Sequence, residues 1–129
     1  MTYDSVRGQV VLFGGTIGTS RVPGPLWIWD GSNWTEPVLP DAPARRTEHA
    51  AAFDEARGET VIFGGSTQFG ATDHTLTWNG SVLAQKTPPL SPSPRVSSAM
   101  AYDAERRQIV LFGGQYGPAF SETWIWNGT

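Results

Sequence analysis

The sequence predicts an all-β fold, and three observations lead to this prediction. A short apolar run that ends in two glycines occurs three times, as residues 11–15, 61–65 and 110–114. The intervals between equivalent glycines are 50 and 49 residues, and repetition at such a period is typical of proteins built from repeated supersecondary units. With 15 glycines and 10 prolines in 129 residues, the chain also contains many turn signals and few long helical patterns.

Composition excludes several classes of function. The net charge is −3, and the nine basic residues do not gather into a face that could follow a phosphate backbone, so nucleic acid is not an expected partner. Without cysteine the chain has no disulfide, thiolate metal site or cysteine nucleophile, and no cofactor is expected. No apolar run is long enough to span a bilayer, and Met1 is not followed by a secretory signal pattern.

Each repeat is expected to begin with a β-hairpin. In the second repeat, apolar residues 49–53 and 60–63 form two strands around residues 54–59. Gly58 can supply the left-handed residue that closes such a turn, and Asp54 can accept the amides of the turn. Residues 3–8 repeat this pattern. In the third repeat Arg107 replaces the glycine, so this turn must either accept a left-handed arginine at some cost or adopt another geometry.

A second hairpin is expected after a variable loop. Its turn is predicted to be a two-residue connection at Asn79-Gly80, and Asp30-Gly31 and Asn127-Gly128 occupy the same place in the other repeats. The strand before the turn alternates, which places two large side chains of each repeat on one face. These pairs are Trp27 with Trp29, Leu76 with Trp78, and Trp124 with Trp126.

The strands before the double glycines are continuous apolar runs, a pattern typical of strands that are covered on both faces. Four antiparallel strands per repeat, stacked between like sheets, describe the blades of a β-propeller. The chain is therefore predicted to form about two and a half four-stranded blades. Repeat 1 covers approximately residues 1–46 and lacks the start of its first strand, repeat 2 covers residues 47–95, and repeat 3 covers residues 96–129 and lacks its last strand.

These motifs resemble the kelch repeat, in particular its bacterial variety, and the resemblance covers nearly the whole chain. The similarity lies in the apolar run before Gly-Gly, in an aromatic residue on the third strand and in Trp34 on the fourth. The chain departs from the pattern at Arg107 and at Leu83, which stands where Trp34 does. The residues that match the structural motif are Gly14, Gly15, Trp29, Trp34, Gly64, Gly65, Trp78, Gly113, Gly114 and Trp126.

The resemblance implies where the remaining residues lie. All six tryptophans and the repeat aromatics Tyr3, Phe53 and Tyr102 are expected in the core. The turn arginines Arg7, Arg57 and Arg106 are expected in solvent, paired with Asp4, Asp54 and Asp103. Because both ends of the chain fall inside a blade of the kelch order, we expect either missing blades on a longer chain or self-assembly that closes the ring.

Ligand recognition is expected at the loops that gather on one propeller face. These loops are residues 16–25, 36–46, 66–73, 87–95 and 115–121. An arginine there could bind a carboxylate or sugar hydroxyls, and an exposed ring could stack on a sugar or grip a peptide. The alternative is structural: the arginines bond to blade carbonyls, the rings cover blade edges, and the histidine lies in the core. The candidates are Arg46, His49, Gln68, Phe69, Arg95 and Tyr116.

No convergent set of catalytic residues is evident, and no metal site is expected from two histidines. The sequence favours a non-catalytic binding or scaffold module that recognises a protein or carbohydrate partner. The alternative, implied by resemblance, is the scaffold portion of a galactose-oxidase-like carbohydrate-active enzyme whose catalytic residues lie outside this segment. A third possibility is a spacer without a ligand. An extracellular or cell-surface location is suggested only by the bacterial kelch resemblance.

Overall fold

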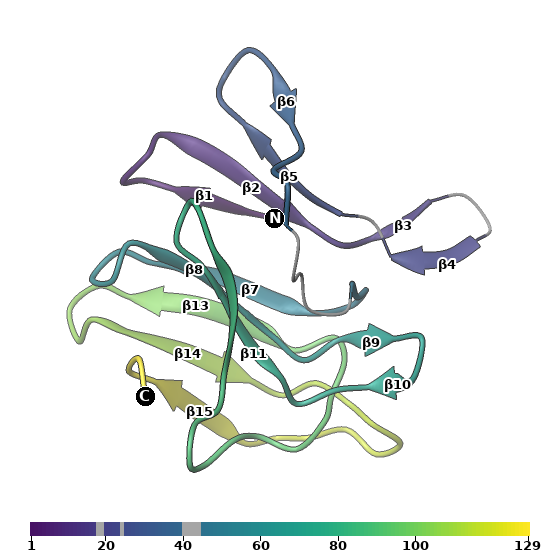
Figure 1. The fold of residues 1–129 in the computed structure, drawn as a ribbon. Helices are drawn as coiled ribbons and strands as arrows, with labels where there is room; N and C mark the ends of the chain where they lie inside the picture. The colour runs from purple at the N-terminus through teal and green to yellow at the C-terminus, as the bar shows by residue number, and fades with distance from the viewer. Residues whose placement is uncertain (18–19, 24, 40–44) are drawn as a thin grey trace.

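The computed structural model describes residues 1–17, 20–23, 25–39 and 45–129, and within these ranges the chain contains strands and turns but no helix. Three larger antiparallel sheets lie one above another (Figure 1). The all-β prediction is confirmed for the described residues. Two short two-stranded ribbons project from these sheets. One pairs β3 (Thr16–Ile17) with β4 (Ser20–Pro23), and the other pairs β9 (Ser66–Thr67) with β10 (Gly70–Ala71).

The three sheets share one strand order. Sheet 1 consists of β1 (Thr2–Asp4), β2 (Gln9–Phe13), β5 (Leu26–Trp29) and β6 (Trp34–Thr35). Sheet 2 consists of β7 (Ala50–Asp54), β8 (Glu59–Phe63), β11 (Thr75–Trp78) and β12 (Leu83–Lys86). Sheet 3 consists of β13 (Ala99–Asp103), β14 (Gln108–Phe112) and β15 (Thr123–Trp126). The register is also repeated, because Tyr3 pairs with Val10, Phe53 with Thr60, and Tyr102 with Ile109.

The first hairpin of each repeat has the predicted turn. Gly8 and Gly58 adopt left-handed backbone angles, with φ of +66° and +64°, and the amide of Gly58 donates to the carbonyl of Asp54 at 2.8 Å. Asp54 Oδ1 accepts the amide of Arg57 at 3.2 Å, as the sequence predicted. Arg107 takes the same left-handed conformation, with φ of +55°, so the third hairpin keeps the turn despite the missing glycine.

The prediction of a two-residue second turn was wrong. Trp78 pairs with Leu83, which leaves four residues in the loop, and among them only Gly80 has a positive φ. The side chain of Asn79 explains the difference, because its Oδ1 accepts the amides of Ser81 at 3.0 Å and Val82 at 2.8 Å. Asp30 makes the same pair of bonds in sheet 1. The residue before the glycine thus acts as an internal cap for a longer loop.

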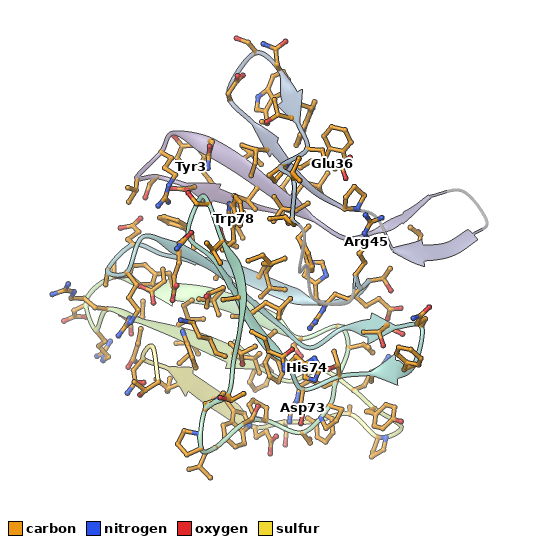
Figure 2. The ribbon with its side chains drawn as sticks, viewed as in Figure 1. Tyr3, Glu36, Arg45, Asp73, His74 and Trp78 are labelled. Atoms are coloured by element: carbon orange, nitrogen blue, oxygen red, sulfur yellow. The ribbon has the colours of Figure 1, made fainter. Side chains whose placement is uncertain are left out.

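Sheets 1 and 2 bury a shared hydrophobic core. Sheet 1 contributes Val11, Phe13 and Leu26, and sheet 2 contributes Ile62, Leu76, Trp78 and Leu83. The hydroxyls of Thr2 and Thr60 lie 3.2 Å apart across the same interface. Figure 2 shows Trp78 in the layer between the two sheets. The alternation predicted for the third strand therefore directs its large side chains toward the preceding sheet.

The interface between sheets 2 and 3 repeats this arrangement. Here Ala52 and Val61 of sheet 2 pack against Ile109 of sheet 3, and Met100, Tyr102 and Trp126 extend the cluster. In both interfaces, the face that carries the large third-strand residues packs on the preceding sheet, and we call it the leading face. The opposite face packs on the following sheet, and we call it the trailing face. Sheet 2 is covered on both.

The expectation that every repeat aromatic lies in the core was wrong for sheet 1. Tyr3 is 60% exposed and Trp34 is 45% exposed. Both belong to the leading face of sheet 1, against which no other sheet of the described chain packs. Phe53 and Trp78, which hold the positions of Tyr3 and Trp29 in sheet 2, are buried because sheet 1 covers them. Position in the stack, and not residue type, decides their burial.

The two ends of the sheets differ in their connections. The tight first hairpins all turn at one end of the stack, on the left in Figure 1, and we call this the turn end. The ribbons β3–β4 and β9–β10 extend from the opposite end, together with the loop that follows β14. We call this the loop end. It corresponds to the face on which ligand recognition was expected.

Candidate functional site

The loop end is built on the double-glycine corners. At the second corner Gly64 and Gly65 have φ of +67° and +93°. The amide of Gly65 donates to the carbonyl of Arg95 at 2.8 Å, and the amide of Gly64 donates to the carbonyl of His74 at 3.2 Å. Gly15 makes the equivalent bond to the carbonyl of Arg46 at 3.2 Å. Each of these two corners therefore holds the loop that leads into the following sheet.

Arg46 and Arg95, one in each of these loops, are fully buried. Arg95 Nη1 donates to the carbonyl of Gly113 at 3.0 Å, and its Nε donates to the carbonyl of Ser93 at 3.0 Å. Nη2 forms an ion pair with Glu122, and the guanidinium lies 4.1 Å from the ring centroid of Phe120. These contacts favour the structural interpretation of Arg95, since its donors are directed at this chain and not at solvent.

Arg46 has the same position one repeat earlier. Its Nη1 donates to the carbonyl of Gly64 at 3.1 Å and approaches the carbonyl of His74 at 3.4 Å. Burial lowers the pKa of Arg46 to about 10, which leaves the side chain charged at neutral pH. Each arginine therefore joins two corners, because its carbonyl binds one double glycine and its guanidinium binds the next.

His49 lies between the first two corners. Its ring packs edge-on against Phe13 at 5.4 Å, and burial, with the charge of Arg46 adding to it, lowers its pKa to about 4. The side chain is therefore neutral at pH 7. Nδ1 is buried and has no hydrogen-bond partner among the described residues. Ser98 replaces it in the next repeat and donates to the carbonyl of Gly113 at 3.4 Å.

The remaining three candidates are exposed. Gln68 and Phe69 form the tip of the β9–β10 ribbon, where Thr67 Oγ1 accepts the amide of Phe69 at 3.1 Å. Tyr116 lies in the corresponding connection of sheet 3, and its amide donates to the carbonyl of Pro118 at 3.3 Å. The structure thus separates the candidates, since the two arginines and His49 lie in the packed corners and the other three face solvent.

A hollow of about 430 Å³ lies beside the first corner, and no sequence pattern predicted it. Phe13, Leu26 and Leu83 form its apolar floor, and the charged residues Glu36 and Arg45 stand at its rim (Figure 2). In the sequence, the only sign that Glu36 and Arg45 could take part in recognition was their position in loop 36–46. Residues 40–44 of the predicted loop 36–46 lie outside the described residues, as do residues 18, 19 and 24 of the predicted loop 16–25.

The described residues contain no metal-binding cluster and no helical membrane span. No three His, Cys, Asp or Glu side chains there gather closely enough to hold a metal ion. Nor do the described ranges include a helix with the length and apolar character of a membrane span. Compared with protein-family models the chain matches none, and no curated protein shows significant similarity to it.

Proposed function

We propose that this chain forms blades of a kelch-type β-propeller and acts as a non-catalytic binding module. Support for the architecture comes from three sheets of one strand order that pack leading face on trailing face. The double-glycine corners and the third-strand tryptophans stand at equivalent places in each sheet. In this proposal the loop end recognises a protein or a carbohydrate.

One observation carries the proposal of recognition. Phe69 and Tyr116 are large, exposed rings on the corresponding loops of adjacent sheets, and both loops start from corners held by buried arginine contacts. An exposed aromatic ring on a rigid support loses little conformational entropy when a ligand covers it. Such rings stack on the apolar faces of sugars or insert into pockets of protein partners.

The test is a binding screen with immobilised oligosaccharides and displayed peptides, followed by affinity measurements on the best probe. Phe69→Ala and Tyr116→Ala are each expected to weaken binding by about tenfold, the effect typical of a central aromatic contact. The matched controls are Val6→Ala and Val82→Ala, which remove exposed apolar groups in hairpin turns at the turn end, away from these loops. They should leave the affinity unchanged.

Two outcomes would contradict the proposal. If no probe binds, the spacer interpretation gains support. If a probe binds but its affinity falls only with Val6→Ala or Val82→Ala, the recognition surface does not lie on these loops. Thermal unfolding of each variant shows whether a change in binding reflects a change in folding.

A further inference from the structure

The two outermost faces of the stack form a complementary pair. The leading face of sheet 1 presents large side chains to solvent, among them Tyr3, Trp29 and Trp34. The trailing face of sheet 3 presents smaller and branched side chains, among them Ala101 and Ile125, together with the ring of Phe112, which is 53% exposed. Both interfaces inside the chain join faces of these two kinds. The two open faces thus match the two sides of an internal interface, but they lie on opposite sides of the molecule.

A polar contact at the turn end accompanies each internal interface. Arg7 pairs with Asp4 at 2.8 Å, and its Nη1 also donates to the carbonyl of Gly58 in the next sheet at 2.9 Å. Its guanidinium lies against Gly80, where an added Cβ would be 2.3 Å from Nε. The expected pairing of Arg7 with Asp4 is confirmed, but the expectation that its side chain is otherwise solvated was wrong, because it also links two sheets.

Arg57 makes the same link between sheets 2 and 3. It pairs with Asp54 at 2.8 Å and donates to the carbonyl of Arg107 at 3.3 Å and to the carbonyl of Asn127. Its guanidinium lies against Gly128, as that of Arg7 lies against Gly80. One arginine per interface thus donates to the first turn of the following sheet and lies against its second turn.

The third arginine of the series has no following sheet to bind in the described chain. Arg106 keeps its ion pair with Asp103 at 3.1 Å, but its side chain is 64% exposed, against 34% for Arg7 and for Arg57. The matching glycine in sheet 1 is Gly31, and an added Cβ there would meet no atom within 4 Å. Arg106 in sheet 3 is therefore a hydrogen-bond donor without a following sheet, and the turns of sheet 1 have the matching acceptors.

A tyrosine adds a second contact of the same kind. The amide of Ala56, in the first turn of sheet 2, donates to Tyr102 Oη on the leading face of sheet 3 at 3.1 Å. Tyr3 holds the position of Tyr102 in sheet 1 and is exposed. The amide equivalent to that of Ala56 in sheet 3 belongs to Glu105. The amide of Glu105 and the hydroxyl of Tyr3 are thus a second donor and acceptor, one at each of the two open faces.

We propose that two copies of this chain associate head to tail, with the trailing face of sheet 3 packed on the leading face of sheet 1 of the next copy. Arg106 then donates to the carbonyls of Gly8 and Asp30, and Tyr3 Oη accepts the amide of Glu105. The contact is heterologous, so further copies add in the same sense until a ring closes. The loop end stays free, and the inference does not depend on which ligand binds there.

Sedimentation velocity of the full chain over a range of concentrations tests the association. Arg106→Glu and Ile125→Ser are each expected to weaken it by about tenfold or more, because one removes the polar link and the other places a hydroxyl in an apolar interface. Val82→Ser is the matched control, since Val82 is 56% exposed, close to the 51% of Ile125, but lies on neither open face. A chain that stays monomeric, or an association that none of these variants changes, would overturn the proposal.

Engineered disulfides test the geometry, and the absence of native cysteine makes the result easy to interpret. Thr2 and Thr60 face each other at 3.2 Å within the chain, and Ala101 and Val10 hold the equivalent positions on the two open faces. Oxidation of mixed Ala101→Cys and Val10→Cys chains should therefore give the mixed dimer. Thr2→Cys with Thr60→Cys in one chain is the positive control. Dimers of Ala101→Cys alone would contradict the head-to-tail arrangement.

Discussion

Gly64→Ala is expected to lower the free energy of unfolding by about 3 to 4 kcal/mol, one of the largest effects of a single methyl group in this chain. A Cβ at this position would lie 2.6 Å from the carbonyl oxygen of Arg95, a backbone atom that also accepts the amide of Gly65. Relieving the clash requires the buried Arg95 segment to move away from the corner. The left-handed φ of +67° adds strain for any residue with a side chain.

Gly58→Ala is the control that isolates this clash. Gly58 has nearly the same backbone angle, with φ of +64°, but an added Cβ would meet only Val6 Cγ2, at 4.0 Å. Its substitution should cost only the conformational strain, about 1 kcal/mol. Urea unfolding followed by tryptophan fluorescence measures both variants. Equal losses at the two positions would contradict the proposed role of the corner.

Asp54→Ala is expected to cost about 3 kcal/mol, the second large effect. The carboxylate is fully buried, accepts the amide of Arg57 and holds its guanidinium in an ion pair at 2.8 Å. Because Arg57 also binds two carbonyls of sheet 3, the substitution removes the group that positions the link between sheets. The loss therefore includes packing between sheets 2 and 3 as well as the turn.

Asp103→Ala provides the comparison for this prediction. Asp103 makes the same bonds to Arg106, at 3.0 Å to its amide and 3.1 Å to its guanidinium, but is partly exposed and its arginine contacts no further sheet. Here we expect a loss much smaller than that at Asp54, measured by the same unfolding experiment on dilute, monomeric protein. A loss at Asp103 as large as that at Asp54 would mean that the turn alone, and not the link, provides the stability.

The sequence predicted the repeated parts of the fold because each is determined by local chemistry. The Gly58 turn requires a left-handed residue, and the strand before each double glycine is apolar on both faces. The direction of the third-strand pairs, such as Leu76 and Trp78, follows from the alternation of a strand. These features depend on a few neighbouring residues, and they recur at a constant spacing.

Apart from the length of the second turn, which the side chain of Asn79 determines locally, what the sequence did not predict depends on contacts between repeats. The exposure of Tyr3 follows from the place of sheet 1 in the stack, which no local pattern records. The link made by Arg7 requires knowing which turns lie side by side. At the loop end, burial assigns Arg46 to the packed corner and leaves Phe69 in solvent, although both were equal candidates in the sequence.

Amide hydrogen exchange measured by NMR tests the central claim, that consecutive repeats stack as sheets through leading and trailing faces. Sheet 2 is the one sheet covered on both sides in the described chain, and residues 60–63 of β8 and all of β11 are buried. Their amides should exchange at least about tenfold more slowly than those of β2 and β14 in monomeric protein, because opening must break two interfaces. Equal protection in all three sheets, or fast exchange in β8, would contradict the stacked arrangement.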